Sequence, residues 1–186
     1  IITGPATELL REACFSDDAR LVVMHAPFGT GKSLTCRKLA IEMAKSWIED
    51  PANSYFPILV DCPDLLRGHI DSVERAVIEH LRRAADLTEE AAKSIWQRQK
   101  VVAILDSFDE VEQSGPQAKR WVEDMQVAAE NRRMRVIVAT RPHAMKFEWL
   151  DSNDRLVEIQ LFDEDQVNTW LRTTGNRVGP PDLTYR

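Results

Sequence analysis

Cysteine is scarce in this chain, with three residues among 186. Cys14, Cys36 and Cys62 are odd in number and lie far apart in the sequence. This spacing fits neither a disulfide framework nor the close cysteine pairs of a zinc site. We therefore expect reduced thiols and a cytoplasmic protein.

Long apolar runs and an excess of positive charge are also missing. No segment approaches the roughly 18 apolar residues that cross a bilayer, and no secretory signal opens the chain, so we expect no membrane span. Acidic residues outnumber basic ones by 30 to 24, which gives a formal charge of -6 and a pI near 5.3. This balance argues against a broad face for binding nucleic acid. The chain begins at Ile1 rather than Met, which suggests a fragment or a processed form.

The sequence does contain a regular alternation of short apolar runs and helical patterns. The apolar runs cover residues 21–24, 56–60, 101–105, 136–139 and 156–161. Apolar residues at helical spacing predict helices around 36–47, 73–81, 88–96 and 118–129. This alternation predicts a parallel sheet covered by helices on both faces. The last run alternates apolar with polar residues, so we place it at an edge of the sheet.

Two helix starts carry a capping signal. Asp86 or Thr88 is a candidate N-cap of the third helical pattern, because a short polar side chain accepts a hydrogen bond from the first helical turn. Asp163 and Gln166 form the pattern of a capping box, which predicts a short helix after the last strand.

A glycine-containing loop joins the first apolar run to the first helical pattern. Its sequence is Ala26-Pro27-Phe28-Gly29-Thr30-Gly31-Lys32-Ser33. In such a loop the glycines let backbone N–H groups converge on phosphate oxygens, Lys32 reaches the terminal phosphates, and the Ser33 hydroxyl binds Mg²⁺. The loop predicts nucleotide binding, although Ala26 stands where the first glycine of the motif is usual. His25, just before the loop, is interpreted as a packed residue at the end of a strand.

Acidic residues follow the third apolar run. Asp106 ends this run and is well placed to hold Mg²⁺ through its waters, since this ion prefers one or two carboxylates plus substrate phosphates. Asp109 and Glu110, just beyond, are candidates to orient or deprotonate the attacking water. Taken alone, acids after a strand are more readily explained as a solvated loop. The phosphate loop upstream favours the metal site.

Thr140 and Arg141 follow the fourth apolar run. Either is a candidate to contact the terminal phosphate, because a hydroxyl donates a hydrogen bond and Arg offers a fixed charge and forked donors. The alternative is that Arg141 pairs with a surface acid. The sequence leaves these two interpretations open.

Together these motifs resemble those of the NACHT family, within the STAND class of signal-transducing P-loop NTPases. The resemblance rests on a Walker A loop at 29–33, a Walker B segment at 105–110 that matches the family's D-[GAS]-hydrophobic-D-E pattern, and residues 140–142. Residues 162–167 also resemble the family's strand-to-helix segment after the sensor strand. The resemblance implies an α/β fold: a three-layer sandwich with a mainly parallel five-stranded sheet of order 5-1-4-3-2.

The resemblance also implies roles for particular residues. The implied catalytic residues are Asp109, Glu110 and Arg141. The implied nucleotide-binding residues are Pro27, Phe28, Gly29, Thr30, Gly31, Lys32, Ser33 and Thr140. The implied Mg²⁺ ligands are Ser33 and Asp106. Which of the two acids at 109 and 110 activates water stays open. No clear adenine-contact motif precedes the loop, although residues 2–5 lie at a position suited to packing against a base.

The activity implied by the resemblance is that of a switch. ATP or ADP, with Mg²⁺, holds such a protein closed, and exchange opens it into an oligomer that signals, commonly in innate immunity or anti-phage defence. We expect a nucleotide-binding domain over residues 1–172 and a linker over 173–186 that leads towards further domains.

Three other functions use the same loop, and one of them is that of another P-loop ATPase. A P-loop kinase would transfer phosphate to an acceptor under a lid rich in arginine, for which Arg82-Arg83 and Arg132-Arg133 are the candidates. A nucleotide-stabilised scaffold would bind without significant turnover. A small GTPase is not supported, because the chain has no N-K-x-D motif to recognise guanine.

Overall fold

The structure is a computed structural model that describes residues 4–16, 21–65, 72–110, 115–130, 134–161 and 163–175. Its strands are β1 (Leu21–His25), β2 (Phe56–Asp61), β3 (Val101–Asp106), β4 (Met134–Thr140) and β5 (Arg155–Glu158). Its helices are α1 (Ala6–Phe15), α2 (Lys32–Glu49), α3 (Cys62–Leu65), α4 (Val73–Ala84), α5 (Glu89–Arg98), α6 (Gly115–Glu130) and α7 (Glu164–Gly175). Short 3₁₀ turns, η2 (Phe108–Glu110) and η3 (Phe147–Trp149), follow β3 and β4.

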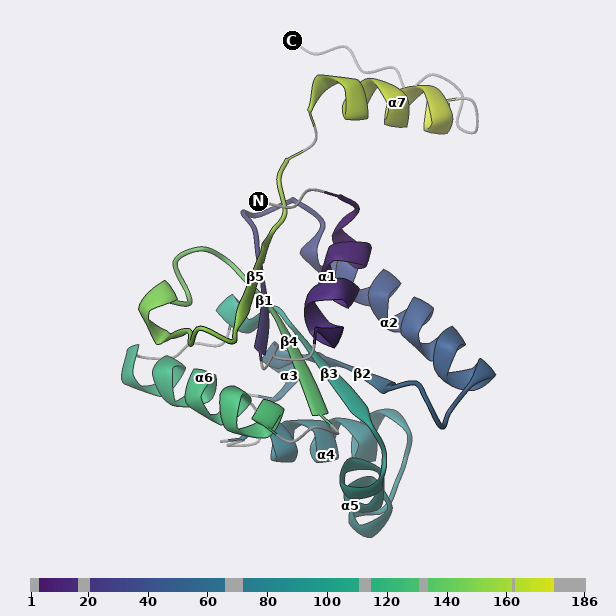
Figure 1. Ribbon diagram of the computed structural model, residues 1–186, viewed down its shortest axis with the longest axis vertical. Coiled ribbons are helices and arrows are strands. Elements are labelled where there is room, and N and C mark those ends of the chain that lie inside the picture. Colours follow the sequence, from purple (N-terminus) through teal and green to yellow (C-terminus); the bar gives the residue numbers. More distant parts are fainter. Residues whose placement is uncertain are drawn as a thin grey trace.

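The strands form one sheet in the order β2-β3-β4-β1-β5, and every neighbouring pair is parallel (Figure 1). This is the predicted order 5-1-4-3-2 read from the other side, and the predicted edge strand, β5, does lie at an edge. Parallel strands need crossovers, and the helical segments of the chain provide them.

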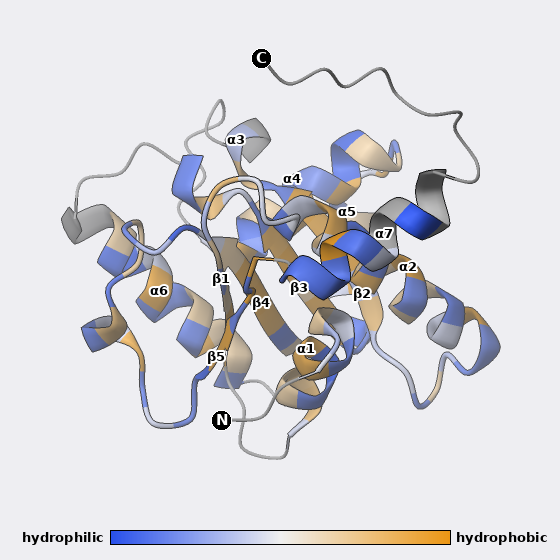
Figure 2. Ribbon diagram, turned by 90° about the horizontal axis from the view of Figure 1, so that it is seen from above, coloured by the Kyte–Doolittle hydropathy of each residue, from blue (hydrophilic) through white to orange (hydrophobic). Residues whose placement is uncertain are grey.

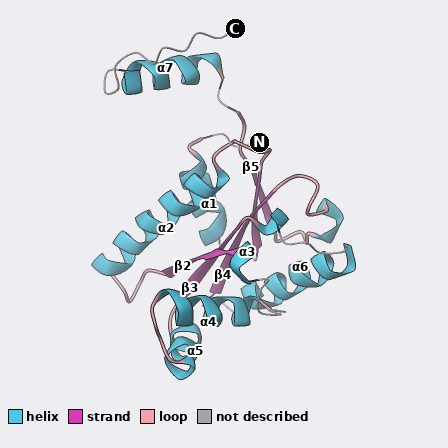
Figure 3. Ribbon diagram, turned by 180° about the vertical axis from the view of Figure 1, so that it is seen from behind, coloured by secondary structure: helices cyan, strands magenta, loops and turns pink. Residues whose placement is uncertain are grey.

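Helices cover both faces of the sheet (Figure 3), because alternate side chains of each strand point to opposite faces. Met24 of β1 packs with Leu10 of α1 and Leu39 of α2 on one face. Val23 packs in a separate cluster that includes Met125 of α6 on the other face. The strands are correspondingly apolar in Figure 2. Each fully buried side chain of this kind contributes about 1.5–3 kcal/mol, so the two clusters fix the three layers.

The predicted capping signals are present at two helix starts. Thr88 Oγ1 accepts a hydrogen bond from Ala91 N at 3.2 Å, which makes Thr88 the N-cap of α5, whereas Asp86 lies in the loop before it with a φ of 50°. Asp163 Oδ1 accepts from Gln166 N at 2.8 Å, and Asp163 N donates to Gln166 Oε1 at 3.0 Å. This reciprocal pair is the predicted capping box, and it starts α7.

The carboxylate of Asp154 fastens three parts of the fold at the amino end of β1. It accepts hydrogen bonds from Leu21 N at 3.2 Å, from Gln126 Nε2 of α6 at 2.6 Å, and from Asp151 N at 2.7 Å. Gln126 is 9% exposed and also donates to Trp149 O. These bonds join β1, α6 and the turn before β5.

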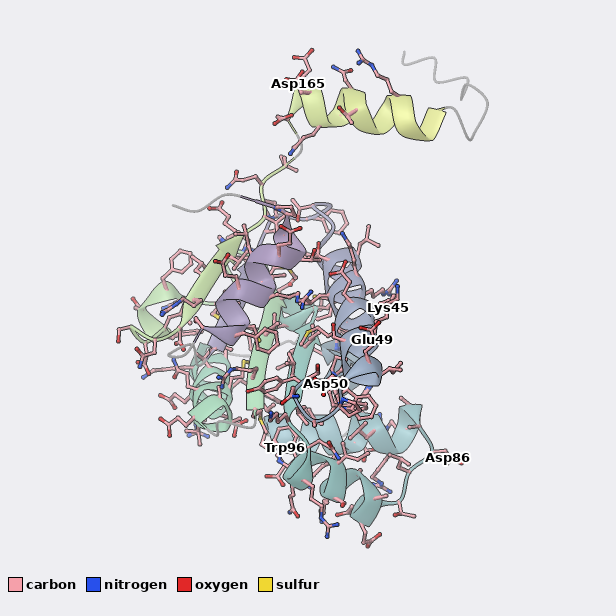
Figure 4. All side chains as sticks on the ribbon, turned by 45° about the vertical axis from the view of Figure 1, so that its right-hand side comes forward. Lys45, Glu49, Asp50, Asp86, Trp96 and Asp165 are labelled. Atoms are coloured by element: carbon pink, nitrogen blue, oxygen red, sulfur yellow. The ribbon has the colours of Figure 1, made fainter. Side chains whose placement is uncertain are left out.

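Some elements differ from the sequence-based expectations. The helix α1 was not predicted, although its buried residues Thr7, Leu10 and Cys14 follow helical spacing. The fifth strand ends at Glu158, before the end of its predicted run. The two ribbon views place α7 apart from the sheet layers, and Figure 4 shows Asp165 on it, clear of the other helices.

The ends of the predicted domain lie partly outside the described residues. The helix α7 continues to Gly175, so residues 173–175 of the predicted linker are helical, while residues 176–186 are outside the described part of the chain. Residues 2 and 3, proposed to lie near a base, are also outside it. The domain boundary at 172 stays a prediction. Among the described helices, none is long and apolar enough to cross a membrane.

Candidate nucleotide site

Polar side chains end all five strands, and the parallel arrangement brings them to one edge of the sheet. In the strand register, His25 lies opposite both Thr140 and Glu158, and Asp61 lies opposite Asp106. The carboxyl edge of an open α/β sheet is where such folds bind ligands. The three predicted motifs, which are far apart in the sequence, all extend from this edge.

The glycine-containing loop leaves β1 and turns sharply into α2. Gly29 and Gly31 have φ angles of 79° and 88°, in the left-handed region that glycine adopts without a steric cost. Ala26 N donates to Thr140 O at 3.3 Å, so the loop starts against the end of β4. Ala26 is fully buried and is not among the described residues with positive φ, which explains why alanine is tolerated where the motif usually has glycine.

The cationic side chain of the loop points back into it. Lys32 Nζ donates to Ala26 O at 2.9 Å and to Pro27 O at 3.0 Å, and Thr30 Oγ1 donates to Pro27 O at 2.8 Å. Lys32 is also the first residue of α2, and the first turn of a helix presents N–H groups without an intrahelical acceptor. The loop therefore combines an ammonium group with the positive end of an 18-residue helix, which is an arrangement that binds anions.

Asp106 faces the same side of the sheet as α2. The residue is 8% exposed, and its Oδ1 accepts a hydrogen bond from Ser107 N at 2.9 Å. Cys36, one turn beyond Lys32, feels both charges: burial raises the pKa of its thiol, Asp106 raises it further, and Lys32 opposes that rise. Asp106 is two residues beyond Ile104, which packs in one cluster with Cys36 of α2, so its side chain leaves the face of the sheet that α2 covers.

The chain turns tightly after Asp106. Ser107 has a φ of 59°, a left-handed conformation that costs a non-glycine residue about 1–2 kcal/mol. Glu110 N donates to Ser107 O at 3.0 Å and closes η2, which carries the remaining acids of the motif. The strained turn at Ser107 thus aims Asp109 and Glu110 across the end of β4.

Arg141 joins all three motifs. Its Nε lies 2.7 Å from Asp109 Oδ2, and its terminal nitrogen lies 3.9 Å from Glu110 Oε1. The guanidinium carbon also lies 5.1 Å from the centroid of the Phe28 ring, which is 81% exposed. Arg141 does pair with an acid, but Asp109 is buried, with 4% of its side chain exposed, rather than a surface residue. Neither this pairing nor the contact with Phe28 was predicted from the sequence.

Two neighbouring side chains at this edge have unsatisfied polar atoms. Thr140 is fully buried and its Oγ1 has no hydrogen-bond partner, and neither ring nitrogen of His25 has one. Oδ1 of Asp109 is likewise buried without a hydrogen-bond partner. Buried polar groups are normally paired, so unpaired ones mark positions where a ligand or water belongs.

The donor set at this edge fits a magnesium ion shared with phosphate better than an ion held by protein alone. Across the described ranges, no group of three or more His, Cys, Asp or Glu side chains forms a metal cage. The buried carboxylate of Asp106 lies on the face of the sheet that α2, the helix that carries Ser33, covers. Mg²⁺ commonly takes one or two carboxylates and completes its shell with waters and substrate phosphates.

Comparisons with known proteins agree with this geometry. A family model described as the NACHT domain matches residues 20–176. No curated protein matches the sequence. AMPPCP-bound DnaA from Aquifex aeolicus is 17% identical, with a TM-score of 0.56, and the match covers 95% of this chain and 53% of that chain.

Other solved structures are similar at the same level. Domain III of the Thermotoga maritima replication initiation protein DnaA is 8% identical, with a TM-score of 0.58, covering 95% of this chain and 72% of that chain. The HORMA:CdnC:Trip13 complex from E. coli MS115-1 is 16% identical, with a TM-score of 0.55, covering 88% and 56%. At these identities the likeness shows the fold alone. The chain spans about half the length of the first solved chains that it matches.

Proposed function

The chain belongs to the NACHT domain family and is a nucleotide-binding P-loop NTPase, and we propose that it works as an ATP-binding, slowly hydrolysing switch that controls self-association and signalling. One observation carries this proposal: the phosphate loop, Asp106 and the Asp109–Arg141 pair lie along one edge of the sheet. The finer part, a role in innate immunity or anti-phage defence, rests on the family resemblance.

In this proposal the loop from Pro27 to Ser33, together with Thr140, holds the nucleotide. Lys32 binds the terminal phosphates, and Ser33 and Asp106 hold Mg²⁺, which neutralises phosphate charge when bound. Lys32 exchanges its two backbone acceptors for phosphate oxygens, because an ammonium group is attracted more strongly to anionic oxygens than to neutral carbonyls. Arg141 keeps donors free for the terminal phosphate while its Nε holds Asp109.

The geometry favours Asp109 over Glu110 as the residue that orients the attacking water. Asp109 is buried, fixed by Arg141 through Oδ2, and has Oδ1 free. The Glu110 side chain is 54% exposed and its contact with Arg141 is long. A group held in place beforehand is the better water-orienting residue, because it needs no reorganisation during the reaction.

A binding experiment tests the nucleotide site. Lys32→Ala should weaken ADP binding by about 10-fold to 100-fold, since a hydrogen bond to a charged group contributes about 1.5–3 kcal/mol. Isothermal titration calorimetry in Mg²⁺ measures this change. The matched control is Lys38→Ala on the same helix, whose Nζ lies 3.7 Å from Glu42 Oε1 in an exposed pair. Equal affinity of both variants for ADP would contradict the proposed site.

A turnover experiment tests hydrolysis. Asp109→Asn should lower the release of phosphate by about 100-fold or more, the range that a positioned acid or base contributes, while ADP affinity is retained. Glu110→Gln should have a smaller effect. Light scattering with ADP and with AMPPCP tests self-association, for which the proposal expects a larger species with the triphosphate analogue.

The scaffold alternative keeps one specific observation in its favour. The Asp109–Arg141 ion pair gives Asp109 a structural contact that requires no turnover. If both acid variants bind nucleotide and hydrolyse it as the parent chain does, the scaffold is the better description. The kinase alternative has less support: Arg82 and Arg83, its described lid candidates, both pair with Glu79 on the solvent-facing side of α4, and Arg132-Arg133 lie outside the described residues.

A further inference from the structure

Buried polar atoms without a hydrogen-bond partner are concentrated at the carboxyl edge of the sheet. In the part of the chain that the structure describes, they are Nδ1 and Nε2 of His25, Oγ1 of Thr140, Oδ1 of Asp109 and Nε of Arg135. Arg135 lies at the other end of β4, and the other three residues lie at the candidate nucleotide site. His25 has no role in the site as proposed so far.

His25 and Thr140 are direct neighbours. They are register partners on the adjacent parallel strands β1 and β4, and such strands lie about 4.8 Å apart. Their side chains leave the same face of the sheet, because His25 is two residues beyond Val23 and Thr140 is two residues beyond Val138, and both valines lie in one core cluster. The ring of Phe147 in η3 packs edge-on against the imidazole, with centroids 5.5 Å apart.

Packing alone does not account for a histidine at this position. A neutral imidazole carries one donor and one acceptor, and each buried polar group left unpaired costs about 1–3 kcal/mol. A phenylalanine ring would make the contact with Phe147 without that cost. Its neighbour Thr140 carries a rotating hydroxyl that both donates and accepts. The imidazole and the hydroxyl are therefore complementary partners.

We propose that His25 is a positioning residue for recognition of the terminal phosphate. When a nucleoside triphosphate binds, a ring nitrogen of His25 pairs with the Thr140 hydroxyl and fixes its rotation, so that Thr140 makes a directed hydrogen bond to the γ-phosphate or to the water beside it. Thr140 is already in direct contact with the phosphate loop, because its backbone oxygen accepts a hydrogen bond from Ala26 N. This inference rests on the proposed nucleotide switch and gives it a means to distinguish ATP from ADP.

The test compares the triphosphate with the diphosphate. His25→Phe should keep or raise the melting temperature and leave the ADP dissociation constant within about twofold, because the ring still packs and the diphosphate does not reach Thr140. AMPPCP binding should weaken by about threefold to tenfold and phosphate release should slow, since one hydrogen bond contributes about 0.5–1.5 kcal/mol. His25→Asn, which keeps a donor and an acceptor, should recover part of this loss.

A double-mutant cycle separates positioning from packing. His25→Phe added to Thr140→Val should weaken AMPPCP binding no further than Thr140→Val alone. The ring-swap control is His143→Phe, at an exposed position, which should change none of these quantities. His25→Leu gives the same measurement if the Phe variant does not fold.

Three results have distinct meanings. Independent, additive losses, or equal weakening of ADP and AMPPCP, would overturn the role of His25 and leave the nucleotide switch intact. Unchanged AMPPCP affinity and turnover in His25→Phe would do the same. Failure of the parent chain to bind either nucleotide would remove the proposed function and this inference with it.

Discussion

Replacing Arg141 by methionine should destabilise the fold even without nucleotide. The substitution keeps most of the side-chain length but removes the partner of Asp109, whose side chain is 4% exposed. Asp109 Oδ1 already lacks a partner, so the variant would leave an almost buried carboxylate with neither oxygen paired. Breaking a buried ion pair costs about 3–5 kcal/mol. Because the Arg141 side chain is 31% exposed, we expect a cost at the lower end of this range, about 3 kcal/mol.

Urea and thermal unfolding followed by circular dichroism measure this cost. A loss of about 3 kcal/mol lowers the melting temperature of a domain of this size by about 6–12 °C. Asp109→Asn in the Arg141→Met background should recover much of it, because the amide carries no charge to bury. Arg120→Met, at an exposed position on α6, is the control. A melting temperature for Arg141→Met within the error of the parent would refute the reasoning.

Three further changes have defined outcomes. Asp154→Ala removes the acceptor of two buried donors and should cost about 2–4 kcal/mol in urea unfolding, whereas Asp151→Ala, an exposed side chain, should cost little. Burial raises the pKa of Cys14 to about 12 and also raises the pKa values of Cys36 and Cys62, so the thiols of the unfolded chain lose their protons at lower pH than those of the folded chain. The free energy of unfolding should therefore fall above about pH 8.5, by up to about 1.4 kcal/mol per thiol for each pH unit. Urea titrations from pH 7.5 to 9.5 measure this fall, and a flat profile would contradict it. Gly31→Ala places a side chain at a φ of 88° and should cost about 1–2 kcal/mol, while Gly4→Ala, where the added carbon meets only Leu9 at ordinary contact distance, should not.

The sequence contained most of the information about the sheet. Continuous apolar runs identify buried parallel strands, and all five predicted runs overlap observed strands. The boundaries were less predictable, because hydrogen-bond register decides where a strand ends: β5 stops at Glu158, although Ile159 and Leu161 continue the alternation. The helix α1 was missed because its stripe is short and only Leu10 and Cys14 of it are strongly apolar.

The site was predictable as a set of motifs but not as a set of contacts. The sequence placed Asp109 and Arg141 in separate roles, one on water and one on phosphate. The structure joins them, because β3 and β4 are neighbours and the turn at Ser107 directs η2 over the end of β4. The strand order was predicted from the family resemblance, but the left-handed turn at Ser107, which brings the two side chains together, was not. The unpaired nitrogens of His25 were not predictable either, because they become visible only when burial and hydrogen bonds are known.

The balance of charge at the edge argues that nucleotide binding needs magnesium. Within the three motifs, Lys32 and Arg141 bring two positive charges against the three carboxylates of Asp106, Asp109 and Glu110. A triphosphate adds about four negative charges, and like charges a few ångströms apart repel by about 1 kcal/mol even in water and more where water is excluded. Arg141 already neutralises the charge of Asp109. A divalent cation beside Asp106 would therefore compensate the added negative charge of the phosphates. We therefore expect calorimetry to show much weaker AMPPCP binding in EDTA than in Mg²⁺, with a smaller difference for ADP. Asp106→Asn should reduce the dependence on Mg²⁺, and equal affinity of the parent chain with and without the ion would contradict this account.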